Sequence, residues 1–198
     1  VLNKKLKFYY MTLFSSMDHK VCLYTINNII DKYFSDYLKD NKLNIKMINS
    51  SKEKYNIINK CLYKVRKYYP KIKILDDKYT DFLIDEIKWI KSCNYMNPET
   101  YQNADRTGRK CKKGTGPQRL LKNSKQRDAI FKLLILYNES LRKNNLIDSE
   151  DKAILALRQA KKHAFEKYTH IVICDSEKFT KVQFDLIDAL KNTCTYSS

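Results

Sequence analysis

At 198 residues, the chain is long enough to bury an apolar core in one or two compact domains. Its 39 Lys and Arg residues outnumber 22 Asp and Glu residues, and the formal net charge of +17 favours a polyanionic partner. Nucleic acid is the expected polyanion, because each neutralised phosphate releases counterions, whereas the lack of any apolar run of about 18 residues argues against a membrane-spanning class.

The six cysteines are scattered and form no C-x-x-C pair or other zinc-binding spacing, which is typical of thiols in a reducing compartment. The amino-terminal stretch also lacks the cleavage-site pattern of a secretory signal. We therefore predict a cytoplasmic protein. A second explanation of the charge stays open, since a chain rich in Lys, Asn, Ile and Tyr with only three Gly is also typical of AT-rich genomes.

The first fifty residues follow an α/β pattern. Apolar side chains recur at helical spacing over residues 3–16, and a β-branched run at 19–26 predicts a strand. A second helical pattern covers 29–38, and residues 43–48 predict another short strand. A strand followed at once by a helix is the repeating unit of a parallel α/β domain.

Residues 51–145 lose the strand signals and become helical. Helical apolar spacing covers 55–69, 79–90 and 128–141. The only break is 94–118, which contains all three glycines and two of the three prolines of the chain. This block predicts an all-helical subdomain inserted into the α/β pattern.

The last fifty residues return to the α/β pattern. They predict a helix over 149–163, a buried strand over 169–174 and a helix over 181–190. The predicted fold class is therefore α/β, mostly helical, with a parallel sheet and an inserted all-helical subdomain. The predicted domains are 1–50 together with 146–198, and 51–145.

The strongest local feature is a basic loop within the helical block. From Arg106 to Arg127 there are nine basic residues and no acidic one before Asp128. Glycines let a backbone approach a phosphate, and the forked guanidinium of Arg matches its oxygens. Tyr95 and Tyr101 precede the loop, where exposed rings would stack on bases. The alternative is a solvated loop that is basic without a partner. The predicted nucleic-acid contacts here are Arg106, Arg109, Lys110, Lys112, Lys113, Arg119 and Lys122.

Nucleotide-hydrolysing chemistry lacks its usual signature. No segment matches the G-x-x-x-x-G-K-[ST] pattern, in which glycine amides wrap the phosphates of a nucleotide. The three histidines do not share a helical ligand spacing, so we predict no metal site. Asp175 and Glu177 follow the predicted strand at 169–174, where an α/β nucleotidase holds magnesium, but acidic residues are also common at strand ends.

Four stretches together resemble an internal segment of a superfamily 1 DNA helicase of the UvrD/Rep type. KVCLYTINNIIDKYF at 20–34 is similar to motif Ia, and YQNADRTGRKCKKGTGPQR at 101–119 resembles part of the inserted helical subdomain. NNLIDSEDKAILAL at 144–157 is similar to the "x-x-D-F-x-D-x-x-x-x-A" helix of that family. YTHIVICDSEKFTKVQFDLIDAL at 168–190 looks like motif II with its following helix.

The resemblance implies a partial RecA-like sheet of the P-loop NTPase type, interrupted by a helical subdomain that contacts DNA. It also implies single-stranded DNA contacts at Thr25 and Asn27 of motif Ia. The family uses ATP and Mg²⁺, but here the motif II positions depart from its pattern: aligned on the following residues, the magnesium-binding Asp falls on Cys174 and the catalytic Glu on Asp175. If the alignment is shifted by one residue, Asp175 takes the position of the magnesium-binding Asp, but Ser176 then takes the position of the catalytic Glu. In neither alignment do the motif II positions, Glu177 included, form an intact catalytic set.

The sequence therefore predicts a DNA-binding segment or degenerate relative of a UvrD/Rep-type helicase, which binds single-stranded or forked DNA and neither hydrolyses ATP nor unwinds DNA alone. No cofactor is expected for this chain by itself. Two alternatives stay open, and with them whether the protein is an enzyme. One is a segment of a full-length, active helicase whose other motor regions lie on a longer chain. The other is a remnant that binds a protein partner.

Overall fold

The computed structural model describes residues 22–48, 50–106, 116–117, 119–163 and 167–192. This part of the chain is mostly helical, with seven α-helices and one small parallel sheet. It divides into two compact units, a helical unit of residues 44–151 and a second unit formed by 1–43 and 152–198. The elements are α2 (Ile26–Asp40), β1 (Lys46–Met47), α3 (Ser51–Tyr68), α4 (Thr80–Ser92), α5 (Pro98–Asn103), α6 (Lys125–Lys143), β2 (Leu146–Ile147), α7 (Ser149–Lys162) and α8 (Lys181–Asp188), with short 3-10 turns at Lys73–Leu75, Asp77–Tyr79 and Ser176–Lys178.

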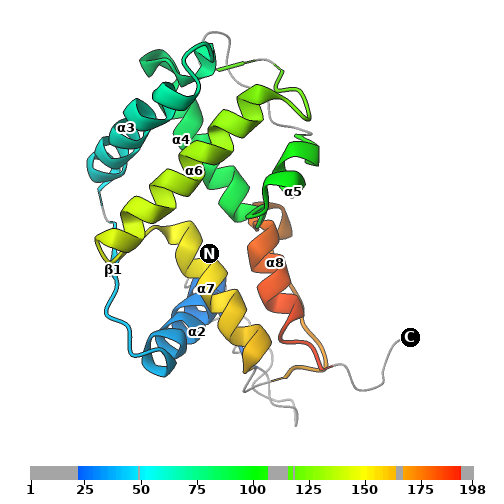
Figure 1. Cartoon of the computed structure of the whole chain (residues 1–198). Coiled ribbons are helices and arrows are strands. Elements are labelled where there is room, and N and C mark those ends of the chain that lie inside the picture. The colour runs from blue at the N-terminus through cyan, green and yellow to red at the C-terminus, as the bar shows by residue number, and fades with distance from the viewer. Residues whose placement is uncertain (1–21, 49, 107–115, 118, 164–166, 193–198) are drawn as a thin grey trace. The chain divides into compact units, whose positions relative to one another are not determined.

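The core of the helical unit is built by α3, α4 and α6. Each helix places an apolar residue at every third or fourth position, so one face of each turns inward. Helix α6 packs along α3 and also contacts α4 and α5, as Figure 1 shows. Fully buried members of the core include Ile58 and Val65 on α3, Ile87 on α4, and Ile130 and Leu133 on α6.

Two helix starts near the basic loop follow from local capping residues. The Ser124 side chain accepts a hydrogen bond from the Arg127 amide and so begins α6. The Asn97 side chain accepts from the Glu99 amide, and Pro98 occupies the first turn of α5. Helix α5 lies inside the segment 94–118 that glycine and proline content had predicted to be a break. That prediction was wrong for 98–103, because a cap followed by proline starts a helix.

The sheet pairs the two ends of the helical unit. Strand β1 runs parallel to β2, with Lys46 opposite Leu146 and Met47 opposite Ile147. The Ile48 amide donates to the Ile147 carbonyl at 2.9 Å and extends the ladder by one bond. The chain therefore enters and leaves this unit side by side. The strand predicted at 43–48 forms, but it is limited to two residues.

The second unit contains α2, α8 and most of α7. Thr25 and Thr180 each form a capping box at the start of α2 and α8. The Gln159 side chain on α7 donates to Asp40 at 2.7 Å, next to the carboxyl end of α2. Lys152 forms an ion pair with Asp31. These polar contacts join α7 to α2 along the length of both helices.

The strand predictions in the second unit were wrong. Residues 22–25 precede α2 without forming a strand, and residues 169–174 have no ladder partner, while Val172 is 90% exposed. A strand forms only where a neighbour satisfies its backbone groups, and no strand of the described residues lies beside 169–174. Within the described part of the second unit, Tyr168 makes a single bridge, parallel to Lys191. The helix predicted at 3–16 lies outside the described residues.

Among the described helices, none combines the length and the apolar character that crossing a membrane requires.

Candidate nucleic-acid interface

The two ends of the basic loop are fastened together by one buried guanidinium. Arg127, on the first turn of α6, is 1% exposed. Its Nη1 and Nη2 groups donate to four backbone carbonyls that lie on both sides of residues 107–115. Buried carbonyl groups need a donor, and a guanidinium supplies several from one side chain. The acceptors are the oxygens of Tyr101, Gln102, Ala104 and Leu120, at 2.6 to 3.1 Å.

Side-chain amides add further bonds across the same stem. The Gln102 amide donates to the Ser124 carbonyl at 3.2 Å, and its oxygen accepts from the Ser124 amide at 3.1 Å. Gln102 also donates to the Asp128 carboxylate. Asn123 donates from its backbone to Gln102 at 3.3 Å and from its side chain to Asn103 at 3.3 Å. Several independent hydrogen bonds therefore tie the segment before residues 107–115 to the segment after them, and we call these tied segments the stem.

Arg106, the first residue of the predicted contact set, is committed to the interior. Its guanidinium forms a two-bond ion pair with Glu86 at 2.9 and 2.6 Å, and its side chain is 7% exposed. It lies near the rings of Phe82 and Trp89. Such a forked, buried pair holds the stem and does not offer the guanidinium to a phosphate. This finding removes Arg106 from the accessible contacts.

The two tyrosines before the loop are also partly or fully interior. Tyr101 is fully buried, and its hydroxyl donates to Glu86 at 3.0 Å. Burial, followed by the negative charge of Glu86, raises the pKa of Tyr101. Tyr95 packs edge-on against Trp89 at 5.4 Å and is half-buried. The prediction that Tyr101 could stack on a base was therefore wrong.

The remaining described members of the set are accessible. Arg119 is exposed, and Lys122 is half-exposed and paired with Asp105 at 2.6 Å. The hydrogen bond and the charge of Lys122 lower the pKa of Asp105. An exposed pair of this kind contributes little to stability, so a phosphate can replace its carboxylate. Arg109, Lys110, Lys112 and Lys113 lie outside the described residues.

Thr25 and Asn27, the contacts implied by motif Ia, lie at the start of α2 in the second unit. The Thr25 hydroxyl accepts from the Asn28 amide at 3.1 Å and donates to the Asn28 side chain at 2.5 Å. Thr25 is therefore occupied as a helix cap. Asn27 is exposed on the first turn and keeps an accessible side chain.

The motif II positions do not assemble a magnesium site. Cys174, Asp175 and Glu177 are all exposed. Asp175 has a left-handed backbone, φ 55°, and its carboxylate pairs with Lys178 at 3.0 Å. Magnesium requires convergent oxygen ligands, and no group of three or more His, Cys, Asp or Glu side chains among the described residues is arranged to hold a metal ion.

A second buried charge cluster, which sequence reasoning missed, lies where the helical unit closes. Lys91, at the end of α4, is fully buried and donates to Asp148 and Asp151, each at 2.8 Å. The Tyr137 hydroxyl donates to Asp148 at 3.1 Å, and Lys54 approaches Asp148 at 3.9 Å. Asp148 also accepts from the Asp151 amide at 2.9 Å and so caps α7.

The two aspartates of this cluster have different pKa shifts. Burial alone would raise the pKa of Asp148, but the positive charge of Lys91, its hydrogen bond and the charge of Lys54 bring it below the ordinary value. For Asp151 burial prevails, helped by the neighbouring Asp148, and raises its pKa to about 6. The start of α7 is therefore joined by charge to the end of α4 in the helical unit.

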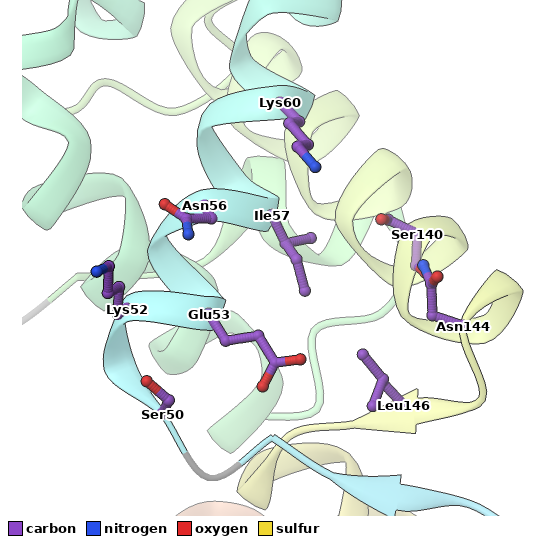
Figure 2. Close-up of a pocket in the computed structure, with 9 residues that line it drawn as sticks. All are labelled: Ser50, Lys52, Glu53, Asn56, Ile57, Lys60, Ser140, Asn144 and Leu146. Carbon is purple, nitrogen blue, oxygen red and sulfur yellow. The ribbon is translucent and has the colours of Figure 1, made fainter.

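A shallow groove of about 470 Å³ runs between α3 and the end of α6. Figure 2 shows Glu53 and Ile57 directed toward Leu146, with Ser140 and Asn144 on the α6 side. Lys52 and Lys60 lie on the α3 side. In the second unit a hollow of about 610 Å³ has a basic rim, whose lysines are Lys161, Lys162, Lys167, Lys181 and Lys191.

Comparisons of the chain with protein families, with curated proteins and with solved structures found no match.

Proposed function

We propose that the protein is a DNA-binding unit related to UvrD/Rep-type helicases, which holds single-stranded or forked DNA through the basic loop of its helical unit. The observation that carries this proposal is the stem built by Arg127. It supports a loop that is rich in Lys and Arg and free of Asp and Glu between two fixed ends.

A fixed stem favours binding for a physical reason. Association costs conformational freedom, and a loop whose ends are already ordered loses less of it. Arg106 serves the stem with Arg127, which leaves six of the seven predicted contacts for phosphates. These are Arg109, Lys110, Lys112, Lys113, Arg119 and Lys122.

The helicase part of the proposal extends to a partial RecA-like domain in the second unit, with Asn27 as its DNA contact. The exposed Cys174 and Asp175 support a chain that does not hydrolyse ATP alone, because neither is held where it could bind magnesium or orient water. If a longer chain or a second protein supplies the other motor regions, ATP turnover belongs to that assembly.

Charge reversal in the loop tests the DNA-binding proposal. For six phosphate contacts, log K should fall with log salt at a slope of about −5 for duplex or forked DNA. Lys112→Glu with Lys113→Glu should reduce the magnitude of this slope by about 2 and weaken binding of labelled forked DNA. Lys46→Glu with Lys88→Glu makes the same charge change elsewhere on the helical unit and serves as the matched control. Equal weakening by both pairs would show that net charge, and not the loop, determines binding.

A second candidate function follows from the exposed segment 169–174. Val172 is 90% exposed in a β-branched, apolar run, and single large apolar residues in such a run suit addition to the edge of another sheet. This favours a protein partner, or further strands of a motor domain, that covers the segment. Val172→Lys should abolish capture of that partner in a pull-down and leave DNA affinity unchanged. Unchanged capture would contradict this candidate.

A further inference from the structure

The outward face of α3 carries a second stretch of positive charge. From residue 54 to residue 75 the chain contains seven Lys and Arg residues and no Asp or Glu residue. This stretch is separate in sequence from the basic loop and has regular helical structure over most of its length. Its charges are therefore arranged by the geometry of a helix.

Helical spacing puts the polar and aromatic members on one side. Ile58, Cys61, Leu62 and Val65 are buried in the core and define the inner face of α3. The outer face carries residues three or four positions apart, which are neighbours on a helix surface. These are Lys60, Tyr63, Lys64 and Lys67, followed by Tyr68 at the edge, and all five are exposed.

The two rings on this face are unusually accessible. Tyr63 is 64% exposed and Tyr68 is 68% exposed. Lys67 lies over the Tyr63 ring, 4.8 Å from its centroid, and Lys132 of α6 lies 5.4 Å from the centroid of Tyr68. Each ring is thus paired with an ammonium group that approaches its face.

The ammonium groups on this face have no carboxylate partner in the part of the chain that the structure describes. Among the described residues, no carboxylate lies within ion-pair distance of Lys60, Lys64 or Lys67. The neighbouring Arg66 differs, since it donates to the Leu75 carbonyl at 2.8 and 2.5 Å and pairs with Asp77. On this face of α3, the ammonium groups without a described carboxylate partner are therefore those of Lys60, Lys64 and Lys67.

Exposed rings interspersed with ammonium groups that have no carboxylate partner among the described residues form an arrangement that binds single strands. Bases stack on aromatic faces without regard to sequence, while lysines follow the phosphates. A lipid surface would require apolar anchors on the same face, and among its described residues this face offers only the two tyrosines. The bases of duplex DNA are already stacked on each other, so a duplex would use the lysines and leave the rings without a role.

We infer that the α3 face formed by Lys60, Tyr63, Lys64, Lys67 and Tyr68, with Lys132 of α6 beside it, is a second nucleic-acid surface that binds single-stranded nucleic acid by stacking bases on the two tyrosines. This surface is separate in sequence from the basic loop. It deepens the proposed function by assigning the unpaired strand to α3 and leaving the loop to hold phosphates.

The test compares two ligands and two kinds of variant in the full chain. The ligands are a labelled oligothymidylate and an abasic oligomer of the same length, which keeps the phosphates and lacks the bases. Tyr63→Leu with Tyr68→Leu should weaken oligothymidylate binding by roughly 10-fold or more and leave abasic binding unchanged. Tyr24→Leu, at a 42% exposed tyrosine in the second unit, is the matched control.

The lysine variant separates charge from stacking. Lys60→Gln, Lys64→Gln and Lys67→Gln together should weaken binding of both ligands and reduce the salt slope by about 2, because each single-strand contact contributes about 0.7. Lys46→Gln, Lys78→Gln and Lys88→Gln remove the same charge from other exposed positions of the helical unit. Far-UV circular dichroism checks that all variants retain their helices.

Three results would overturn the inference. One is unchanged oligothymidylate affinity in the double tyrosine variant, and another is equal weakening by both lysine triples. The third is binding to anionic vesicles that competes with the oligonucleotide and depends on the same tyrosines. Failure of the loop proposal looks different, since Lys112→Glu with Lys113→Glu would then have no effect while the α3 variants still weaken binding.

Discussion

The helical unit and the second unit use their charged residues in opposite ways. In the helical unit Arg127, Lys91 and Glu86 are fully buried, and each has charged or carbonyl partners at hydrogen-bond distance. In the second unit the aligned motif II residues, such as Asp175, lie at the surface. The difference teaches that buried charges with several partners organise the described helical unit, whereas Asp175 and Lys178 of the second unit pair only at the surface.

Removing the buried ammonium should have the largest effect on stability. Lys91→Met keeps the volume but leaves Asp148 and Asp151 buried without their common partner, so the free energy of unfolding should fall by about 3 to 5 kcal/mol. Urea denaturation followed by circular dichroism measures this. Lys88→Met, at an exposed position one turn earlier, should change it by less than about 0.5 kcal/mol. A similar fall in the free energy of unfolding for both variants would contradict the proposed difference between the buried and the exposed lysine.

Replacing the buried guanidinium of Arg127 by a single ammonium group should have the second largest effect on stability. Arg127→Lys keeps the positive charge, but one ammonium group cannot donate to all four carbonyls on both sides of the loop. The free energy of unfolding should therefore fall by about 2 kcal/mol. The same variant should lose affinity for forked DNA, because the stem loosens. Arg142→Lys, exposed at the end of α6, is the control. A stable Arg127→Lys protein with normal binding would show that the stem does not depend on this residue.

The dependence of stability on pH tests the buried carboxylate Asp151 of the helical unit. Asp151 has a folded-state pKa of about 6 against an ordinary value of 3.8, so between these pH values the folded state holds the proton more often than the unfolded state. Its contribution to the free energy of unfolding therefore falls as pH rises through this window. Asp151→Asn should remove that fall, as the difference between two urea series shows. Parallel pH curves for the two proteins would contradict the assignment.

The smallest effect is expected in the second unit. Val172→Thr should change the free energy of unfolding by less than about 0.5 kcal/mol, because a 90% exposed side chain loses no buried contacts. Leu186→Ala in the same unit, at a fully buried position of α8, should cost about 2 to 4 kcal/mol. A large cost at Val172 would indicate that residues 169–174 are buried in solution.

Helix positions could be predicted from the sequence wherever apolar residues recurred at helical spacing over a stretch long enough for a helix. The pattern ending at Tyr69 corresponds to α3, and the pattern at 128–141 lies inside α6. Strands were harder, because a β-branched run such as 169–174 specifies a strand only if another strand lies beside it. The run itself carries no information about that neighbour.

The candidate site could be predicted only as a region. The density of Lys and Arg located the loop, but composition alone does not separate Arg127, which serves four carbonyls, from Arg119, which is exposed. The sequence also did not predict that Lys91 is buried, because nothing in its local pattern distinguishes it from an exposed lysine on α4. A search for long acid-free stretches, applied to the whole chain, would also have found residues 54–75.

The parallel pairing of β1 with β2 has a practical consequence. Because Lys46 faces Leu146 across one strand spacing of about 5 Å, the ends of residues 44–151 meet at one point. Because the two ends are adjacent, we expect this unit to tolerate expression alone, insertion into a surface turn of an unrelated host protein, or circularisation with a short peptide linker. The loop and the α3 face would be carried along with it.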